Sequence, residues 1–291
     1  MKKMEGIKFY LEYEEEENHI TLVQKISDYI NEHKIYEYEA LTIGYWEEAW
    51  DNDPEAIIKY LVENKSKFPH LKKIHLGDME GEECEISWIN HTDVSPLVKA
   101  FDIEELTITG AGGLRLVDIS GDSLKKLTII SGGISKEVLE DIKNAKLPNL
   151  EYLELYLGVE DYGFDGSLSD LEPFMKKENF PNLKYLGLKN SEIEDAICSK
   201  IMDESIIENL EILDLSLGTL GDTGANEILK NVEKLTNLKK LDLTHHYIAD
   251  ELVKKIENAF AKTNVELLID KGDAESYMYD DEEWRYPYIT E

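Results

Sequence analysis

The pattern Leu-x-x-Leu-x-Leu, in which isoleucine can replace leucine, recurs along nearly the whole chain. In the second half the spacing is regular, because Leu183, Leu210, Leu238 and Val265 follow one another after 27, 28 and 27 residues. This pattern and period are typical of a leucine-rich-repeat solenoid, in which each repeat buries its apolar face only against its neighbours. Copies of the pattern begin at Leu71, Ile103, Leu124, Leu150, Leu183, Leu210 and Leu238.

Each copy is followed by a loop and a helical pattern, so we expect an α/β fold. The predicted architecture is a right-handed β-α horseshoe with a parallel sheet on its concave face and helices on its convex face. Because the repeat is continuous, we predict a single domain over residues 1–291. Its parts are an N-terminal cap (1–36), the repeats (37–270) and an acidic, aromatic-rich C-terminal cap (271–291).

Several local patterns refine this prediction. Apolar residues alternate over 7–13, which indicates a strand, and the charge run 14–17 indicates a turn. Ser169-Asp-Leu-Glu172 fits a capping box at a helix start. Only 21 residues separate Ile103 from Leu124, so we expect no full helix there. Later helices are expected to begin near Asp195, Asp222 and Asp250.

Charge limits the possible partners. The formal net charge is -31, with 62 acidic against 31 basic residues, so nucleic acid and anionic membrane are excluded as expected partners. The same field favours a basic protein segment, although acidic outer faces also serve solubility alone. The first residues lack an apolar signal-peptide core, and Cys84 and Cys198 lie far apart. Both observations favour a cytoplasmic protein with reduced, buried thiols.

Six segments together resemble one family of bacterial leucine-rich-repeat proteins. They are Glu85-Ile-Ser-Trp-Ile89, Gly113-Leu-Arg-Leu116, Leu186-Gly-Leu-Lys-Asn-Ser-Glu-Ile193, Leu213-Asp-Leu-Ser-Leu-Gly-Thr-Leu220, Leu241-Asp-Leu-Thr-His-His-Tyr247 and Trp284-Arg-Tyr286. The repeats are similar to those of the ribonuclease-inhibitor type. The resemblance implies a curved α/β fold and a bacterial, cytosolic setting, and it implies no activity.

The residues between the leucines point outward and form rows across neighbouring strands, which lie ~4.8 Å apart. In the middle row, Gly187 leaves a gap between Glu154 and Asp214, with tyrosines close by. Aromatic rings and carboxylates around a hollow can hold a basic side chain of a partner. Tyrosine pairs that only stabilise the sheet explain the same residues. The predicted partner-binding residues are Tyr152, Glu154, Tyr156, Tyr185, Gly187, Lys189, Asp214, Asp242 and His246.

A second candidate surface lies in the loops after the first strands. Trp46, Trp50 and Trp88 fall in these loops, and tryptophan is enriched at binding hot spots. Loops also use their aromatic residues to pack over the edge of a solenoid, so this alternative stays open.

The sequence does not indicate catalysis, metal binding or a cofactor. Adjacent histidines such as His245 and His246 point to opposite sides of a strand, and no third ligand stands at a recognisable spacing. No nucleophile motif or phosphate-binding loop is present. The arginines Arg115 and Arg285 are expected to stabilise the short central repeat and the C-terminal cap through carboxylate pairs.

We therefore predict a non-catalytic scaffold that binds a protein partner, through a basic segment, on an acidic, tyrosine-containing concave face. Concave solenoid surfaces are commonly used in this way. The alternative is an accessory or enzyme subunit that binds a peptide or a small cationic ligand.

Overall fold

The computed structural model describes residues 5–33, 37–279 and 282–290. The chain forms two compact units. Unit 1 contains the described residues up to Ile130 together with Glu140–Asn149, and unit 2 contains Ser131–Leu139 and the described residues from Leu150 to Thr290. The single domain expected from the continuous repeat stays a prediction.

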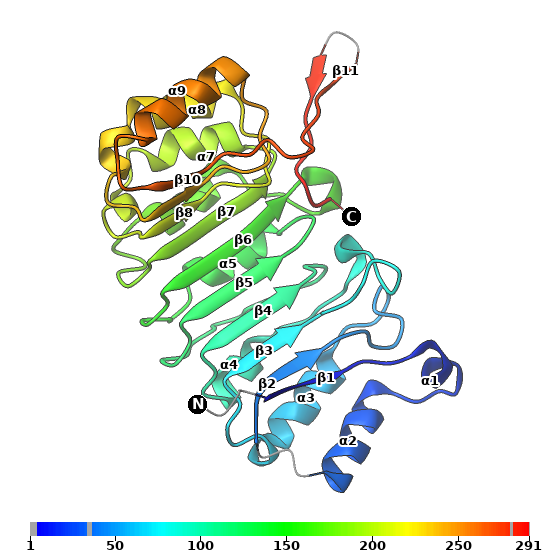
Figure 1. Ribbon diagram of the computed structural model, residues 1–291. Helices are drawn as coiled ribbons and strands as arrows, with labels where there is room; N and C mark the ends of the chain where they lie inside the picture. The colour runs from blue at the N-terminus through cyan, green and yellow to red at the C-terminus, as the bar shows by residue number, and fades with distance from the viewer. Residues whose placement is uncertain (1–4, 34–36, 280–281, 291) are drawn as a thin grey trace. The chain divides into compact units, whose positions relative to one another are not determined.

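Unit 1 has five parallel strands that pair in chain order. The helices α2, α3 and α4 follow one another beside these strands (Figure 1). The strands are β1 (Glu5–Phe9), β2 (Tyr38–Ile43), β3 (Lys73–Leu76), β4 (Glu105–Thr109) and β5 (Lys126–Ile130). The helices are α1 (Tyr13–Glu17), α2 (Leu22–Glu32), α3 (Glu55–Glu63) and α4 (Ser95–Ala100), with 3-10 turns at Lys65–Lys67 and Ile86–Trp88. Helix α5 (Lys136–Lys143) contributes residues to both units.

Unit 2 repeats this plan with five further parallel strands in chain order. Its strands are β6 (Tyr152–Gly158), β7 (Tyr185–Ser191), β8 (Ile212–Asp214), β9 (Lys240–Asp242) and β10 (Glu266–Leu268). Its helices are α6 (Leu168–Leu171), α7 (Glu194–Ile201), α8 (Asp222–Lys230) and α9 (Asp250–Phe260), with 3-10 turns at Glu160–Tyr162, Glu172–Met175, Ser205–Glu208 and Val232–Leu235. Helices α7, α8 and α9 pack side by side over the strands of unit 2 (Figure 1).

The leucine pattern accounts for the core. The three apolar positions of each copy are buried, as Leu183, Leu186 and Leu188 illustrate for β7. The predicted rows are confirmed within unit 2, where Glu154 lies opposite Gly187 and Gly187 opposite Asp214. Alternation along each strand therefore places the leucines on the core face and the polar residues in rows on the other.

Helix starts agree with the prediction at three positions and differ at two. Helices α7, α8 and α9 begin at or next to the expected aspartates. The charge run 14–17, expected as a turn, is part of α1, because Glu12 and Glu15 form a capping box. The second capping box uses Ser167 and Asp170, two residues earlier than predicted.

The short central repeat lacks a helix between β4 and β5, as expected, and an ion pair stabilises it. Arg115 donates two hydrogen bonds to Asp141, at 2.8 and 3.0 Å, and the Leu116 amide donates a third at 2.9 Å. Burial alone would raise the pKa of Asp141, but these three donors hold it below its usual value. The carboxylate pair predicted for Arg115 is present, and its stabilising role stays a prediction.

The C-terminal segment packs back onto unit 2. Strands β11 (Tyr277–Tyr279) and β12 (Glu282–Trp284) form an antiparallel hairpin, and the chain then crosses the turns that follow β9 and β8 and the end of β7. Tyr288 donates its amide hydrogen to the Leu217 carbonyl at 2.8 Å. Ile289 and the side chain of Asn190 exchange two hydrogen bonds of 2.8 and 2.7 Å. Part of the segment predicted as a C-terminal cap thus packs along the edge of unit 2.

The described part of the chain contains no helix with both the length and the apolar character that crossing a membrane requires.

Replacing Arg115 with alanine should lower the free energy of unfolding by about 1.5 kcal/mol, because Asp141, 11% exposed, would lose its charged partner. Arg115 itself is 39% exposed, so a value near the lower end of the range for charged hydrogen bonds is expected. Urea denaturation measures the change. Lys143→Ala, which breaks an exposed pair with Glu140, is the control and should cost at most about 0.5 kcal/mol. Equal losses in the two variants would contradict this role for Arg115.

Candidate functional site

The predicted site on the sheet of unit 2 forms one connected network around Lys189. We call it the Lys189 cluster, made of Tyr152, Glu154, Tyr156, Tyr185, Lys189 and Asp214. The Lys189 ammonium lies 3.0 Å from Asp214 Oδ2 and 3.4 Å from Glu154 Oε1. It also lies 4.9 Å from the centre of the Tyr156 ring, a cation–π distance. Lys189, Glu154 and Asp214 are all buried.

Hydroxyl groups complete the hydrogen bonding of both carboxylates, and Ser216 supplies the donors to Asp214 Oδ1. Tyr185 donates its hydroxyl hydrogen to Asp214 at 2.6 Å, and Tyr152 donates to Glu154 at 2.9 Å. The rings of Tyr152 and Tyr185 stack with centres 3.8 Å apart. Burial and the neighbouring carboxylates raise the pKa of Tyr185, so its hydroxyl stays protonated and remains a donor.

The cluster is therefore charged and internally paired at neutral pH. Burial alone would raise the pKa of Asp214, but the Lys189 cation and hydrogen bonds from Ser216 and Tyr185 hold it below its usual value. Burial likewise acts to lower the pKa of Lys189, yet Asp214 and the other partners raise it above the usual value. The two groups stabilise each other's charged forms.

The hollow expected at Gly187 is filled. A Cβ atom on Gly187 would lie 3.1 Å from Tyr185 Cε1 and 3.4 Å from Glu154 Cγ, so the tyrosine ring occupies the space that the missing side chain leaves. The expected place for a partner's basic side chain is taken by the chain's own Lys189. Asp242, the next acid in the row, pairs with Lys240 at 3.0 Å. The structure therefore brings the predicted residues together, with Lys189 in the place expected for a partner's side chain.

Two other predicted surface residues are buried. His246 is 1% exposed, accepts the Ile248 amide hydrogen at its Nδ1 and lies 3.2 Å from the Ile269 carbonyl through its Nε2. Trp46 is 1% exposed and donates to the Asn52 carbonyl at 3.0 Å. Neither can contact a partner. In the second loop surface, Trp50 and Trp88 do reach the solvent, at 40% and 60% exposure.

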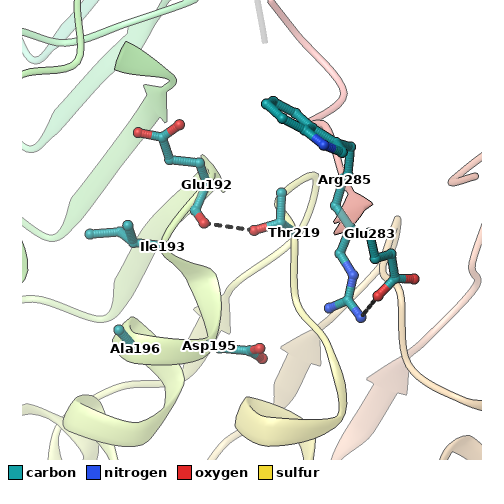
Figure 2. A pocket seen from close by; sticks show the side chains of 8 residues that line it. Glu192, Ile193, Asp195, Ala196, Thr219, Glu283 and Arg285 are labelled. Atoms are coloured by element: carbon teal, nitrogen blue, oxygen red, sulfur yellow. Dashed lines mark hydrogen bonds and ion pairs between the residues drawn. The ribbon is translucent and has the colours of Figure 1, made fainter. Parts of the chain in front are cut away.

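An open pocket of about 590 Å³ lies where the C-terminal segment passes the start of α7. We call it the tail pocket; Figure 2 shows its lining. Residues after β7, the first turn of α7, the loop after β8 and strand β12 with the residue that follows it all contribute. They are Glu192, Ile193, Asp195, Ala196, Thr219, Glu283, Trp284 and Arg285.

Hydrogen bonds fix two sides of this pocket. Thr219 donates its hydroxyl hydrogen to the Glu192 carbonyl at 2.9 Å, and Arg285 donates to Glu283 at 2.7 Å (Figure 2). Asp195 accepts amide hydrogens from Gly221 and Gly224 at 2.9 and 2.8 Å. Arg285 thus pairs with a carboxylate and shapes the C-terminal segment, as predicted.

Glu192 forms one wall of the tail pocket, and two further acids outside the lining lie close to it. Burial raises the pKa of Glu192, and the nearby carboxylates of Glu160 and Asp161 raise it further. Within the described residues, none of these three acids forms an ion pair. Sequence reasoning missed this wall, because 160–161 and 192 follow different strands and share no motif.

A solved structure is similar to this chain over nearly its whole length. A crystal structure of a protein from Bacteroides fragilis, a structural-genomics target, matches this chain with a TM-score of 0.86 and 35% sequence identity. The match covers 98% of this chain and 77% of that one. This chain belongs to the family of that protein. No family model and no curated protein matches the sequence.

A buried acid, Glu194, lies beside the Lys189 cluster. Glu194 is fully buried, and neither carboxylate oxygen has a hydrogen-bond partner. Burial, with the charges of Asp214 and Asp195, raises its pKa well above the usual value, so the group stays neutral. Both cysteines are buried and unpaired, as expected. No three acids, histidines or cysteines are grouped to hold a metal ion in the chain as described.

Replacing Lys189 with methionine should lower the free energy of unfolding by roughly 3 kcal/mol or more at pH 7.5, because two buried carboxylates would lose their cation. The loss should shrink towards pH 5. Without Lys189 the pKa of Asp214 rises, and an acid with a raised folded pKa is most favourable to the fold at low pH. Lys239→Met, which breaks an exposed pair with Glu211, should cost about 1 kcal/mol or less. A loss of equal size at both pH values would refute the buried ion pair.

Replacing Glu194 with glutamine should raise the free energy of unfolding at pH 7.5 by at least ~1 kcal/mol. The unfolded chain ionises this carboxyl above pH ~4.3, whereas the fold keeps it neutral, so the natural protein loses stability as the pH rises. The advantage of the variant should therefore disappear near pH 4.5. Denaturation across this range, with exposed Glu257→Gln as control, measures it. An advantage that does not change with pH would contradict a raised pKa.

Proposed function

We propose that this chain is a leucine-rich-repeat protein, with repeats like those of ribonuclease inhibitor, that binds a basic segment of a protein partner and performs no catalysis. The parallel strands in chain order and the buried leucine positions support the repeat assignment. The net charge of -31 supports a basic partner, since it attracts and orients cationic surfaces.

The uncompensated acidic wall of the tail pocket carries this proposal. Glu192 lines the pocket beside the apolar side chains of Ile193 and Ala196, and the carboxylates of Glu160 and Asp161, outside the lining, lie near enough to raise the pKa of Glu192. Trp284, 45% exposed, adds an aromatic side chain to the lining. Apolar contact together with unpaired acids suits a lysine or arginine, whose aliphatic stem packs while its head is paired.

The Lys189 cluster serves a different role in this proposal. Its acids are already paired and its tyrosines already bonded, so a partner's cation would have to displace Lys189 from a buried position. We assign the cluster to the stability of the sheet, and we assign binding to the loops at the ends of the strands.

Binding of a fluorescent lysine-rich peptide tests the proposal, with an acidic peptide as the negative probe. Glu192→Lys should weaken binding roughly tenfold, about 1.4 kcal/mol, because it reverses the charge of the pocket wall. Exposed Glu257→Lys on α9 is the matched control, since each variant changes the net charge from -31 to -29. Added salt should weaken binding to the natural protein. Equal weakening of peptide binding by Glu192→Lys and Glu257→Lys would show that the net charge of the protein attracts the peptide without a specific site. That result would overturn the tail pocket as the binding site.

A further inference from the structure

A second pocket, in unit 1, combines aromatic rings with carboxylates. It encloses about 460 Å³ between the chain after β1, the turn after β2 and the loop after β3. We call it the N-terminal pocket. Its aromatic lining comes from Tyr10, Tyr13, Tyr45 and Trp50. This volume falls within the ~300–1,000 Å³ typical of small-ligand sites.

The pocket is fixed by hydrogen bonds between its walls. Leu11 donates its amide hydrogen to the Tyr45 carbonyl at 2.8 Å, which joins the two segments. The Tyr45 hydroxyl donates to Glu16, with both carboxylate oxygens at 3.1 Å, and the Glu48 amide donates to Glu16 at 3.0 Å. Helix α1 is thereby held against the turn after β2, so the pocket is formed before any ligand arrives.

Large aromatic side chains in this pocket remain open to solvent. Tyr13 is 74% exposed and Trp50 is 40% exposed, although the ring of Trp50 lies 6.2 Å from that of buried Tyr45. Aromatic rings left at the mouth of a formed cavity offer both apolar area and the negative face of the ring. Such faces attract cations.

The carboxylates of this pocket also lack counter-charges. They belong to Glu12, Glu16, Glu82 and Glu83. Within the described residues no lysine, arginine or histidine pairs with any of them. Lys25 and Lys8 lie 5.1 and 5.6 Å from the ring of Tyr10, but they pair with Glu15 and Asp78, which do not line the pocket. This arrangement is the reverse of the Lys189 cluster, in which the chain supplies its own cation.

We propose that the N-terminal pocket binds an organic cation, namely an ammonium or guanidinium group on an alkyl chain. The group would lie among the carboxylates while its alkyl chain contacts the rings of Tyr13 and Trp50. The source is a lysine or arginine side chain or a free amine of similar size. This site lies in a different unit from the tail pocket, and it does not depend on the function proposed above.

Nuclear magnetic resonance of the indole N–H groups tests this assignment, because the chain has four tryptophans and Trp50 alone lines the N-terminal pocket. The probes are N-acetyl-lysine amide, N-acetyl-arginine amide, agmatine and the neutral N-acetyl-norleucine amide. The cationic probes should shift the Trp50 signal saturably, and norleucine should not. Tighter binding of the amino-acid amides would identify a protein segment as the source, and tighter binding of agmatine a free amine.

Tyr13→Ala and Trp50→Leu should each weaken binding about threefold, as expected for the loss of one exposed ring contact. Calorimetric titration measures this loss, because Trp50→Leu removes the indole that reports binding by resonance. Trp88→Leu, at an exposed tryptophan outside the pocket, is the matched control and should leave binding unchanged. Norleucine binding as tight as lysine, or no saturable shift at Trp50, would overturn the inference. A shift confined to Trp284 would also overturn it, while placing the cation in the tail pocket.

Discussion

Parallel strands in equal register place chemically equivalent positions beside one another, and this constraint shapes the whole of unit 2. Glu154, Gly187, Asp214 and Asp242 occupy one row on neighbouring strands. Acids at such spacing repel one another and lose solvation when they are covered. Lys189 sits two residues beyond Gly187, and its buried ammonium lies between the carboxylates of Glu154 and Asp214. The stacked tyrosines and the glycine follow from this one ion pair.

Acidic residues in the loops have a different environment from those on the sheet of unit 2. On the sheet of unit 2 the carboxylates of Glu154, Asp214 and Asp242 pair with lysines of the fold, whereas Glu192 and the carboxylates of the N-terminal pocket pair with no lysine, arginine or histidine among the described residues. Sheet positions are fixed by neighbouring repeats, so an unpaired charge there would destabilise the core. Loops meet solvent and tolerate unpaired charge. This difference between paired acids on the sheet and unpaired acids in the loops explains why an acidic protein can keep a stable sheet and still offer binding sites for cations.

The repeat pattern predicted the strands, the rows and three helix starts, because each depends on residues close together in sequence. The chemistry around Gly187 was also predicted from the row, but its occupant was not. A lysine two residues along the strand was counted as part of the surface, and its reach back over the row depends on side-chain conformation. The walls of both pockets come from segments without a common period, so the spacing of residues in the sequence did not predict them.

The returning C-terminal segment changes how unit 2 can lose its structure. In most solenoids a repeat contacts only its neighbours, so the end repeat can fray by itself. Here Tyr286 is joined to Tyr247, Tyr288 to Leu217 and Ile289 to Asn190, a separation of 99 residues for the last pair. These bonds reach three successive repeats, so the repeats beneath the segment are coupled and should open as one cooperative block. A short peptide segment thus acts as a clamp along the edge of the stack.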